Sequence, residues 1–103
     1  MSTFENVTVD KAANIYFNGD VTSRKITFSN GEIKTLGIMM PGEYTFGTEA
    51  AELMEIQSGS VSILLKGSEH WQNIETGQSF NVAANSSFDI KVNKITDYCC
   101  SYL

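Results

Sequence analysis

The chain has 103 residues, of which 42% are apolar and 11% aromatic, with a single proline. This length allows one hydrophobic core and the composition excludes a disordered chain, so we predict one domain over residues 1–103. The formal net charge of −5 and the scattered positions of the seven Lys and Arg residues exclude a basic surface that binds nucleic acid.

Neither a membrane span nor a signal peptide is visible in the sequence. No apolar run approaches the roughly 20 residues that a membrane-spanning helix needs. The first residues, Met1–Glu5, lack the basic and apolar regions of a signal peptide. We therefore expect a cytoplasmic protein without a membrane partner.

The first half of the chain alternates between apolar and polar residues, as β-strands do. Residues Asp10–Ile15 are compatible with a single helical turn. The pair Asn30-Gly31 lies between a strand pattern that ends near Phe28 and one that resumes at Ile33, which predicts a hairpin. Pro41-Gly42 then predicts a turn that redirects the chain.

The second half continues this pattern. The segment Thr48–Met54 has good helix propensity, but at about two turns such a helix is marginal, so we interpret it as a loop or widened turn. Glu55–Ser60 predicts a further turn. Four later segments also alternate, and in each of them a set of side chains shares one face of the strand. These sets are Val61, Ile63 and Leu65; Phe80 and Val82; Phe88, Ile90 and Val92; and Tyr98, Cys100 and Tyr102. Short strands separated by glycines predict an all-β barrel or sandwich.

The cysteines and the histidine give no functional signal. Cys99 and Cys100 are adjacent, so on a strand they face opposite sides, and we expect reduced thiols rather than a disulfide or a zinc site. His70 stands alone in a turn-like stretch without a partner in the sequence.

The spacing of several residues resembles the two motifs of metal-binding cupins. Gly37 is followed by five residues and then Glu43-Tyr44-Thr45, while Glu52 stands seven residues before a glycine. Gly77 opens the second motif, in which Phe88 stands where the last histidine would be. The resemblance implies a single-domain cupin, an RmlC-like jelly roll also described as a double-stranded β-helix barrel.

The histidine ligands of that motif are absent. Glu43, Thr45 and Phe88 replace them, and Glu52 is the remaining carboxylate. Two carboxylates suit only magnesium or calcium with help from water, so we predict no metal and no other cofactor.

Side-chain alternation ranks the polar residues. Glu43 and Thr45 share one face of their strand, and in the ligand places of the motif they would point into the barrel. Arg24 is in phase with Ile26 and Phe28. It lies either on an exposed strand end, which we favour, or inside, as a partner for Glu43 or for an anionic ligand.

Longer runs resemble the small bacterial pyrimidine/purine nucleoside phosphorylases over roughly residues 14–103. These runs cover residues 37–46, with the tetrapeptide Glu-Tyr-Thr-Phe, and residues 52–59, 77–82 and 98–102, together with Trp71. The resemblance implies a homodimeric enzyme of nucleoside salvage, a glycosyltransferase of the pentosyltransferase class. It would cleave purine and pyrimidine nucleosides with phosphate to the free base and α-D-ribose 1-phosphate, with phosphate as co-substrate. The chain departs from the family pattern at Ala83, where Pro is common, and at Ser101, where a basic residue is often found, so the phosphate ligands stay open.

In that reaction Glu43 and Thr45 would be the catalytic residues, because positioning and electrostatics supply most of the rate. The other candidates are substrate-binding residues: Tyr44, Phe46, Met54 and Phe88 for stacking on the base, and Glu52 and Arg24 for polar contacts. Alternatives stay open for several of them. Tyr44 and Phe46 can be core aromatics, Met54 can serve packing, and Glu52 can close a loop by accepting backbone N–H groups. The competing function is a non-catalytic cupin that binds a sugar, a nucleoside or a small effector, and a third is a structural module.

Overall fold

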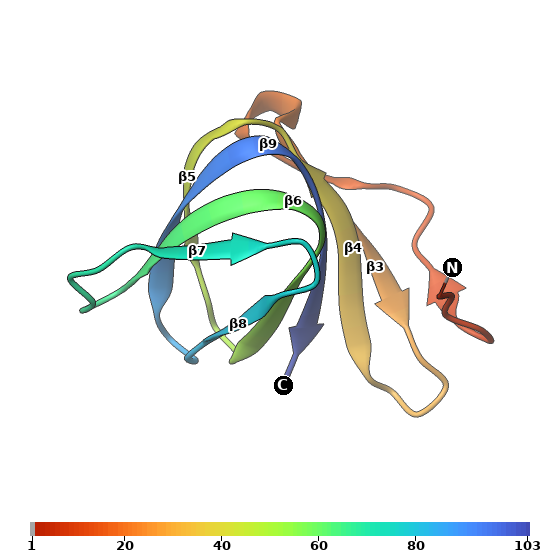
Figure 1. Cartoon of the computed structure of the whole chain (residues 1–103). Helices are drawn as coiled ribbons and strands as arrows, with labels where there is room; N and C mark the ends of the chain where they lie inside the picture. The colour runs from red at the N-terminus through yellow and green to blue at the C-terminus, as the bar shows by residue number, and fades with distance from the viewer. Residues whose placement is uncertain (1) are drawn as a thin grey trace.

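The chain folds into antiparallel β-strands that curve around a common interior (Figure 1). The computed structural model describes residues 2–103. The strands are β1 (Thr8–Val9), β2 (Asn14–Tyr16), β3 (Val21–Thr27), β4 (Ile33–Met39), β5 (Gly42–Gly47), β6 (Glu52–Leu65), β7 (Gln72–Glu75), β8 (Ser79–Val82) and β9 (Ser87–Tyr102), and a 3-10 turn, η1 (Phe17–Gly19), joins β2 to β3. The predicted all-β barrel is confirmed.

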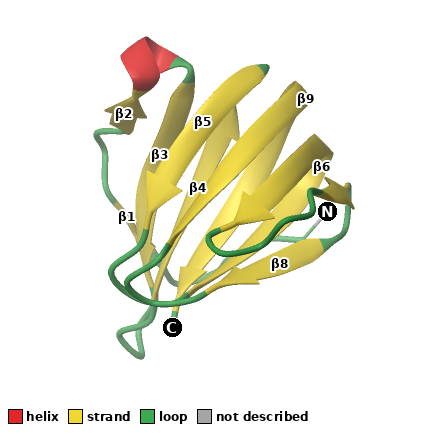
Figure 2. Cartoon of the chain, turned by 90° about the vertical axis from the view of Figure 1, so that its left-hand side faces the viewer, coloured by secondary structure: helices red, strands yellow, loops and turns green. Residues whose placement is uncertain are grey.

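The two long strands β6 and β9 organise the barrel. They pair with one another along most of their length, and both bend (Figure 1). On its other side, β9 pairs with β5 through residues 87–92 and with β4 through residues 96–101. The other edge of β6 pairs with β8 and β7, and β3 extends the sheet beyond β4, so the strands lie side by side in Figure 2.

Much of the core comes from alternate residues of β9. Phe88, Ile90, Val92, Thr96 and Tyr98 are buried, and the exposed Lys94 interrupts the series. Along β6 the alternation changes phase, because Met54 and Ile56 are buried before the middle of the strand and Val61 and Ile63 after it. Register shifts between Ile56 and Val61 cause this change.

The turn predicted over Glu55–Ser60 is therefore wrong. The chain continues as one strand with bulges, and Gly59 makes the bulge possible. Its φ of 130° is rare for other residues, and a Cβ there would lie 2.8 Å from the Cα of Thr96. Glycine here marks a close approach of two strands, not the end of one.

The other turn predictions have mixed outcomes. The hairpin at Asn30-Gly31 is confirmed, with the amide of Gly31 donating to the carbonyl of Phe28 at 3.0 Å. Pro41-Gly42 forms the corner between β4 and β5, as predicted. The helical turn over Asp10–Ile15 is wrong, because β2 begins at Asn14 and pairs with the edge of β3.

The segment Thr48–Met54 is a loop as far as Ala51, as interpreted, and β6 begins at Glu52. Thr48 holds this loop to the turn before β9. Its hydroxyl donates to the carbonyl of Ala83 at 2.6 Å and accepts from the amide of Ser86 at 3.0 Å. Within residues 2–103, no helix is long and apolar enough to cross a membrane.

Candidate functional site

A cavity of about 160 Å³ lies inside the barrel, between β2, β3, β4, β5, β6 and β9. The side chains of its floor are buried, and those of its rim are open to solvent. The floor is formed by Ser23, Thr35, Met39, Met54, Phe88, Tyr98 and Cys100, and the rim by Tyr16, Phe46, Gly47, Glu52 and Tyr102.

One carboxyl group, that of Glu52, lines this cavity. Glu52 is the first residue of β6 and lies opposite Tyr102 of β9, where the alternation that buries Met54 turns it inward. The thiol of Cys100 donates a hydrogen bond to Glu52 Oε1 at 3.5 Å. The sequence placed a carboxylate here correctly, whereas the alternative in which Glu52 closes a loop has no support from its contacts.

Burial perturbs both members of this pair. It raises the pKa of Glu52, and the hydrogen bond from Cys100 opposes the rise in part. Burial, and after it the negative charge of Glu52, raises the pKa of the Cys100 thiol to about 12. The thiol therefore stays protonated and remains a donor to the carboxylate.

Three tyrosines surround the same space. Tyr98 is buried, and its hydroxyl donates to the backbone carbonyl of Thr22 at 3.1 Å. Burial raises its pKa far above the usual range, with further contributions from Tyr102, Cys100 and Tyr16. Burial also raises the pKa of Tyr102 to about 12. The hydroxyls of Tyr98 and Tyr102 therefore stay neutral at ordinary pH.

Gly37 on β4 makes room for this arrangement. A Cβ at Gly37 would overlap the carbonyl oxygen of Thr22 and lie 2.8 Å from the ring and hydroxyl of Tyr98. The first glycine of the cupin-like motif thus has a packing reason, because it lets Tyr98 reach across β4 to β3.

The opposite wall is apolar. Phe46 and Phe88 stack with their ring centroids 5.6 Å apart, and Phe88 contacts Phe80 edge to face at 5.5 Å. Phe46, Met54 and Phe88, predicted from the sequence to contact substrate, all line the cavity. The cavity is therefore amphipathic, with hydroxyls and a carboxyl on one side and aromatic rings on the other.

The expectation that Glu43 and Thr45 point into the barrel is wrong. Both lie on the outer face of β5, where the side chain of Glu43 is 75% exposed and 3.9 Å from the ammonium of Lys91. Thr45 donates to Asp89 Oδ1 at 2.8 Å. The alternation is offset by one residue from the motif, so that Tyr44 and Phe46 take the inward places.

Glu43 and Thr45 instead line an outer hollow of about 480 Å³. Lys91 lies there between Glu43 and Trp71, with its ammonium 4.1 Å from the centroid of the Trp71 ring. A role of Glu43 and Thr45 in catalysis stays a prediction, although they do not share a cavity with Glu52.

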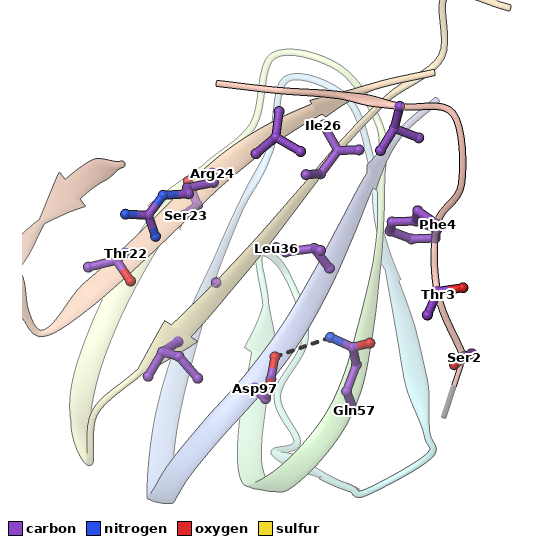
Figure 3. Close-up of a pocket in the computed structure, with 14 residues that line it drawn as sticks. Ser2, Thr3, Phe4, Thr22, Ser23, Arg24, Ile26, Leu36, Gln57 and Asp97 are labelled. Carbon is purple, nitrogen blue, oxygen red and sulfur yellow. Dashed lines mark hydrogen bonds between the residues drawn. The ribbon is translucent and has the colours of Figure 1, made fainter. Parts of the chain in front are cut away.

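Tyr44 and Arg24 are also placed away from the cavity. Tyr44 belongs to the buried core, and its hydroxyl donates to the carbonyl of Met40 at 2.7 Å, which agrees with the packing alternative. Arg24 is exposed on the outer face of β3, as favoured, and lines a groove of about 640 Å³ (Figure 3).

Sequence reasoning missed eight residues of the cavity: Tyr16, Ser23, Thr35, Met39, Gly47, Tyr98, Cys100 and Tyr102. A signal for the last three was present. They alternate along one strand on the face that continues from Phe88, so their inward direction followed from β9 alone. Nothing local marked Ser23 and Thr35, which become neighbours only through the β3–β4 pairing.

The donor set of the cavity does not fit a transition metal. It offers one carboxyl, a thiol that stays protonated and several neutral hydroxyls, whereas such metals prefer imidazole and thiolate. Elsewhere in residues 2–103, no three His, Cys, Asp or Glu side chains come together as ligands.

Comparisons with known proteins agree with this picture. The family model described as "Pyrimidine/purine nucleoside phosphorylase" matches residues 11–102. A protein of that name from Colwellia psychrerythraea (strain 34H / ATCC BAA-681) is 61% identical over 103 residues, which is 100% of this chain and 99% of the relative. A protein of unknown function from Acinetobacter sp. ADP1 superposes with a TM-score of 0.95 at 38% identity, covering 98% of each chain.

An RmlC-like cupin from Shewanella frigidimarina NCIMB 400 superposes with a TM-score of 0.70 over 98% of this chain and 86% of the other. At 12% identity this likeness concerns the fold alone. The predicted cupin fold is confirmed, and the chain belongs to the pyrimidine/purine nucleoside phosphorylase family.

Proposed function

We propose that the protein is a broad-specificity nucleoside phosphorylase of nucleoside salvage, a pentosyltransferase that acts in the cavity of the barrel. It converts purine and pyrimidine nucleosides and phosphate to the free base and α-D-ribose 1-phosphate. In this step the bond between C1′ and the base nitrogen breaks and a bond between C1′ and a phosphate oxygen forms. The proton of the hydrogen phosphate ends on the base, so the reaction needs no further reactant.

The observation that carries the proposal is the position of Glu52. Its half-buried carboxyl faces a cavity whose other polar groups are neutral hydroxyls and a thiol. The transition state of glycosidic cleavage carries positive charge on the ribose, and a carboxylate in a site of low dielectric stabilises such charge strongly. The ionised form of Glu52 also accepts hydrogen bonds from ribose hydroxyls.

The phosphate has no basic partner among the residues that line the cavity. Its oxygens would accept hydrogen bonds from the tyrosine, serine and threonine hydroxyls of the polar wall. The same feature favours the second candidate function, a non-catalytic cupin that binds a sugar, a nucleoside or a small effector, because such a protein needs no phosphate site.

Incubation with inosine or uridine, with and without phosphate, separates the two candidates. The proposal predicts free base and ribose 1-phosphate in equal amounts, only when phosphate is present. Binding of the nucleosides without release of base, at high protein concentration and with several nucleosides, would favour the binding protein. The proposed cytoplasmic location is tested by fractionation of the source cells.

We further propose a homodimer that forms through the outer face of β3 and β4. Ile38 is 37% exposed there and lines the same groove as Leu36. In Figure 3, Arg24 lies on one side of Leu36 and the hydrogen-bonded pair Asp97 and Gln57 on the other. A two-fold axis through this patch would bring the arginine of one copy toward the aspartate of the other. Ile38→Asp should convert the dimer to a monomer in light scattering, while Ile95→Asp, at an exposed isoleucine outside the groove, should not.

A further inference from the structure

The size of the cavity limits how much of a nucleoside it can enclose. Its volume of about 160 Å³ is below the roughly 300–1,000 Å³ of pockets that bury a whole small-molecule ligand. A nucleoside has two parts, a ribose that is constant among ribonucleosides and a base that varies. The cavity has room for one of them, and the part that enters determines how the protein treats different bases.

The polar wall of the cavity favours the constant part. Ser23 is 4%, Thr35 7% and Tyr98 5% exposed, so their hydroxyls are fixed and shielded from water. Tyr98 and Ser23 already have hydrogen-bond partners in Thr22 and Asn14. The Glu52 carboxylate accepts a hydrogen bond from Cys100 at 3.5 Å and has room for further donors, so an enclosed ligand without a matching donor leaves it underpaired, which makes the site selective. Purines and pyrimidines present different donors and acceptors, whereas their riboses present the same hydroxyls. A broad-specificity site with this wall must therefore hold the ribose there.

We propose that the ribose enters the cavity beside Glu52 and that the base stays at the rim, stacked against the exposed rings of Tyr16 and Tyr102. Tyr16 is 43% and Tyr102 42% exposed, and both line the opening. Stacking on an aromatic ring tolerates any base, because each base has a π face and its hydrogen-bonding edge remains in water. This assignment rests on the proposed phosphorylase activity and explains its breadth.

The backbone next to Tyr16 supports a fixed position for its ring. Phe17 has φ of 51° and Asn18 of 57°, a left-handed conformation that is unfavourable for a bulky side chain. The Phe17 ring packs 4.9 Å from that of Tyr44 and 5.5 Å from that of Phe46, measured between centroids. These contacts hold the turn against the edge of β5, and Phe17 is thus a positioning residue for Tyr16.

Removal of the rim rings tests the stacking. Tyr16→Ala and Tyr102→Ala should each raise KM about tenfold, by the same factor for inosine and for uridine. Tyr16→Phe and Tyr102→Phe keep the ring, so they should raise the nucleoside KM far less than the alanine variants do. Trp71→Ala, which removes a ring of 42% exposure away from the rim, is the matched control. An unchanged nucleoside KM in both alanine variants, or a rise for only one class of base, would overturn the assignment.

Substrate analogues test the orientation independently. N6-benzyladenosine should be cleaved with kcat/KM within about threefold of adenosine, because its added group projects into water. 2′-Deoxyadenosine should be at least tenfold worse, because it leaves a buried polar partner unmatched. The reverse order would show that the base is the enclosed part.

The failure of this inference differs from failure of the proposed function. If no nucleoside releases base, the phosphorylase activity is refuted. The dissociation constants of the same three nucleosides, measured by calorimetry, then decide the orientation with the same expected ratios.

Discussion

Substitution of Glu52 by Gln removes one negative charge from the cavity and leaves the shape of the side chain unchanged. Since Glu52 carries the only carboxyl that lines the cavity, no neighbour there can replace its charge. Removal of a group aimed at developing charge in an enclosed site costs about 10²–10³ in kcat. Because Glu52 is half-buried and partly screened by solvent, we expect the lower end, a loss of about 100-fold in kcat.

Glu43→Gln is the matched control for this substitution. It makes the same chemical change on the outer face of the barrel, where the side chain of Glu43 is 75% exposed and has a single ion pair with Lys91. Exposed ion pairs contribute little, so kcat/KM should remain within about twofold of the wild type.

The assay is steady-state release of hypoxanthine from inosine at saturating phosphate, over a range of pH. The pKa of Glu52 is raised, and the ionised form is the active one, so wild-type kcat/KM should rise with pH through that pKa. Glu52→Gln should lose this acidic limb. A large loss in Glu43→Gln with full activity in Glu52→Gln would refute the interior site and support the outer hollow.

Three further predictions concern stability and metal. Gly37→Ala should lower the free energy of unfolding by about 3 kcal/mol or more, because the new Cβ overlaps the backbone and the Tyr98 ring. Gly47→Ala is the control, since its Cβ would lie 3.9 Å from the nearest atom, the carbonyl oxygen of Ser86, and it should cost far less. Urea titrations measure both. A carboxyl with a raised pKa favours the folded state in its protonated form; this contribution is complete below the unfolded value of 4.5 and is lost as pH rises through the folded pKa. The stability of the wild type relative to Glu52→Gln should therefore fall over that pH window and then level off, and a difference independent of pH would contradict the burial of this carboxyl. Dialysis against EDTA should leave phosphorolysis unchanged, because the cavity offers one carboxyl and no imidazole; a strong loss that zinc or magnesium restores would show a metal site.

Local chemistry made part of the fold predictable. Asn30-Gly31 supplies the backbone freedom that a tight hairpin needs, so its position was correct from two residues. Along β9 the apolar residues alternate from Phe88 to Val92, and after an exposed interruption at Lys94 and Ile95 the same phase resumes with the buried Thr96 and Tyr98. Where a strand has no irregularity, its period of two is sufficient to assign faces.

The errors arise where the phase of a strand depends on its partners. Gly59 belongs to a bulge that matters only because Thr96 of β9 lies against it, and no local signal separates a bulge from a turn. On β5, both faces carry large side chains, so the sequence does not show which face is inside. The inward positions differ by one residue from those of the cupin motif, so Tyr44 points inward and Glu43 outward. The carboxyl of the cavity is therefore Glu52, whereas the more conspicuous tetrapeptide contributes only Phe46.

A crystal structure with ribose 1-phosphate bound tests the central claim most directly. The account predicts the ribose inside the barrel, with its hydroxyls within hydrogen-bonding distance of the Glu52 carboxylate and no contact to Glu43. Ribose 1-phosphate bound instead in the outer hollow beside Glu43, Thr45 and Lys91, with the cavity unchanged, would contradict it.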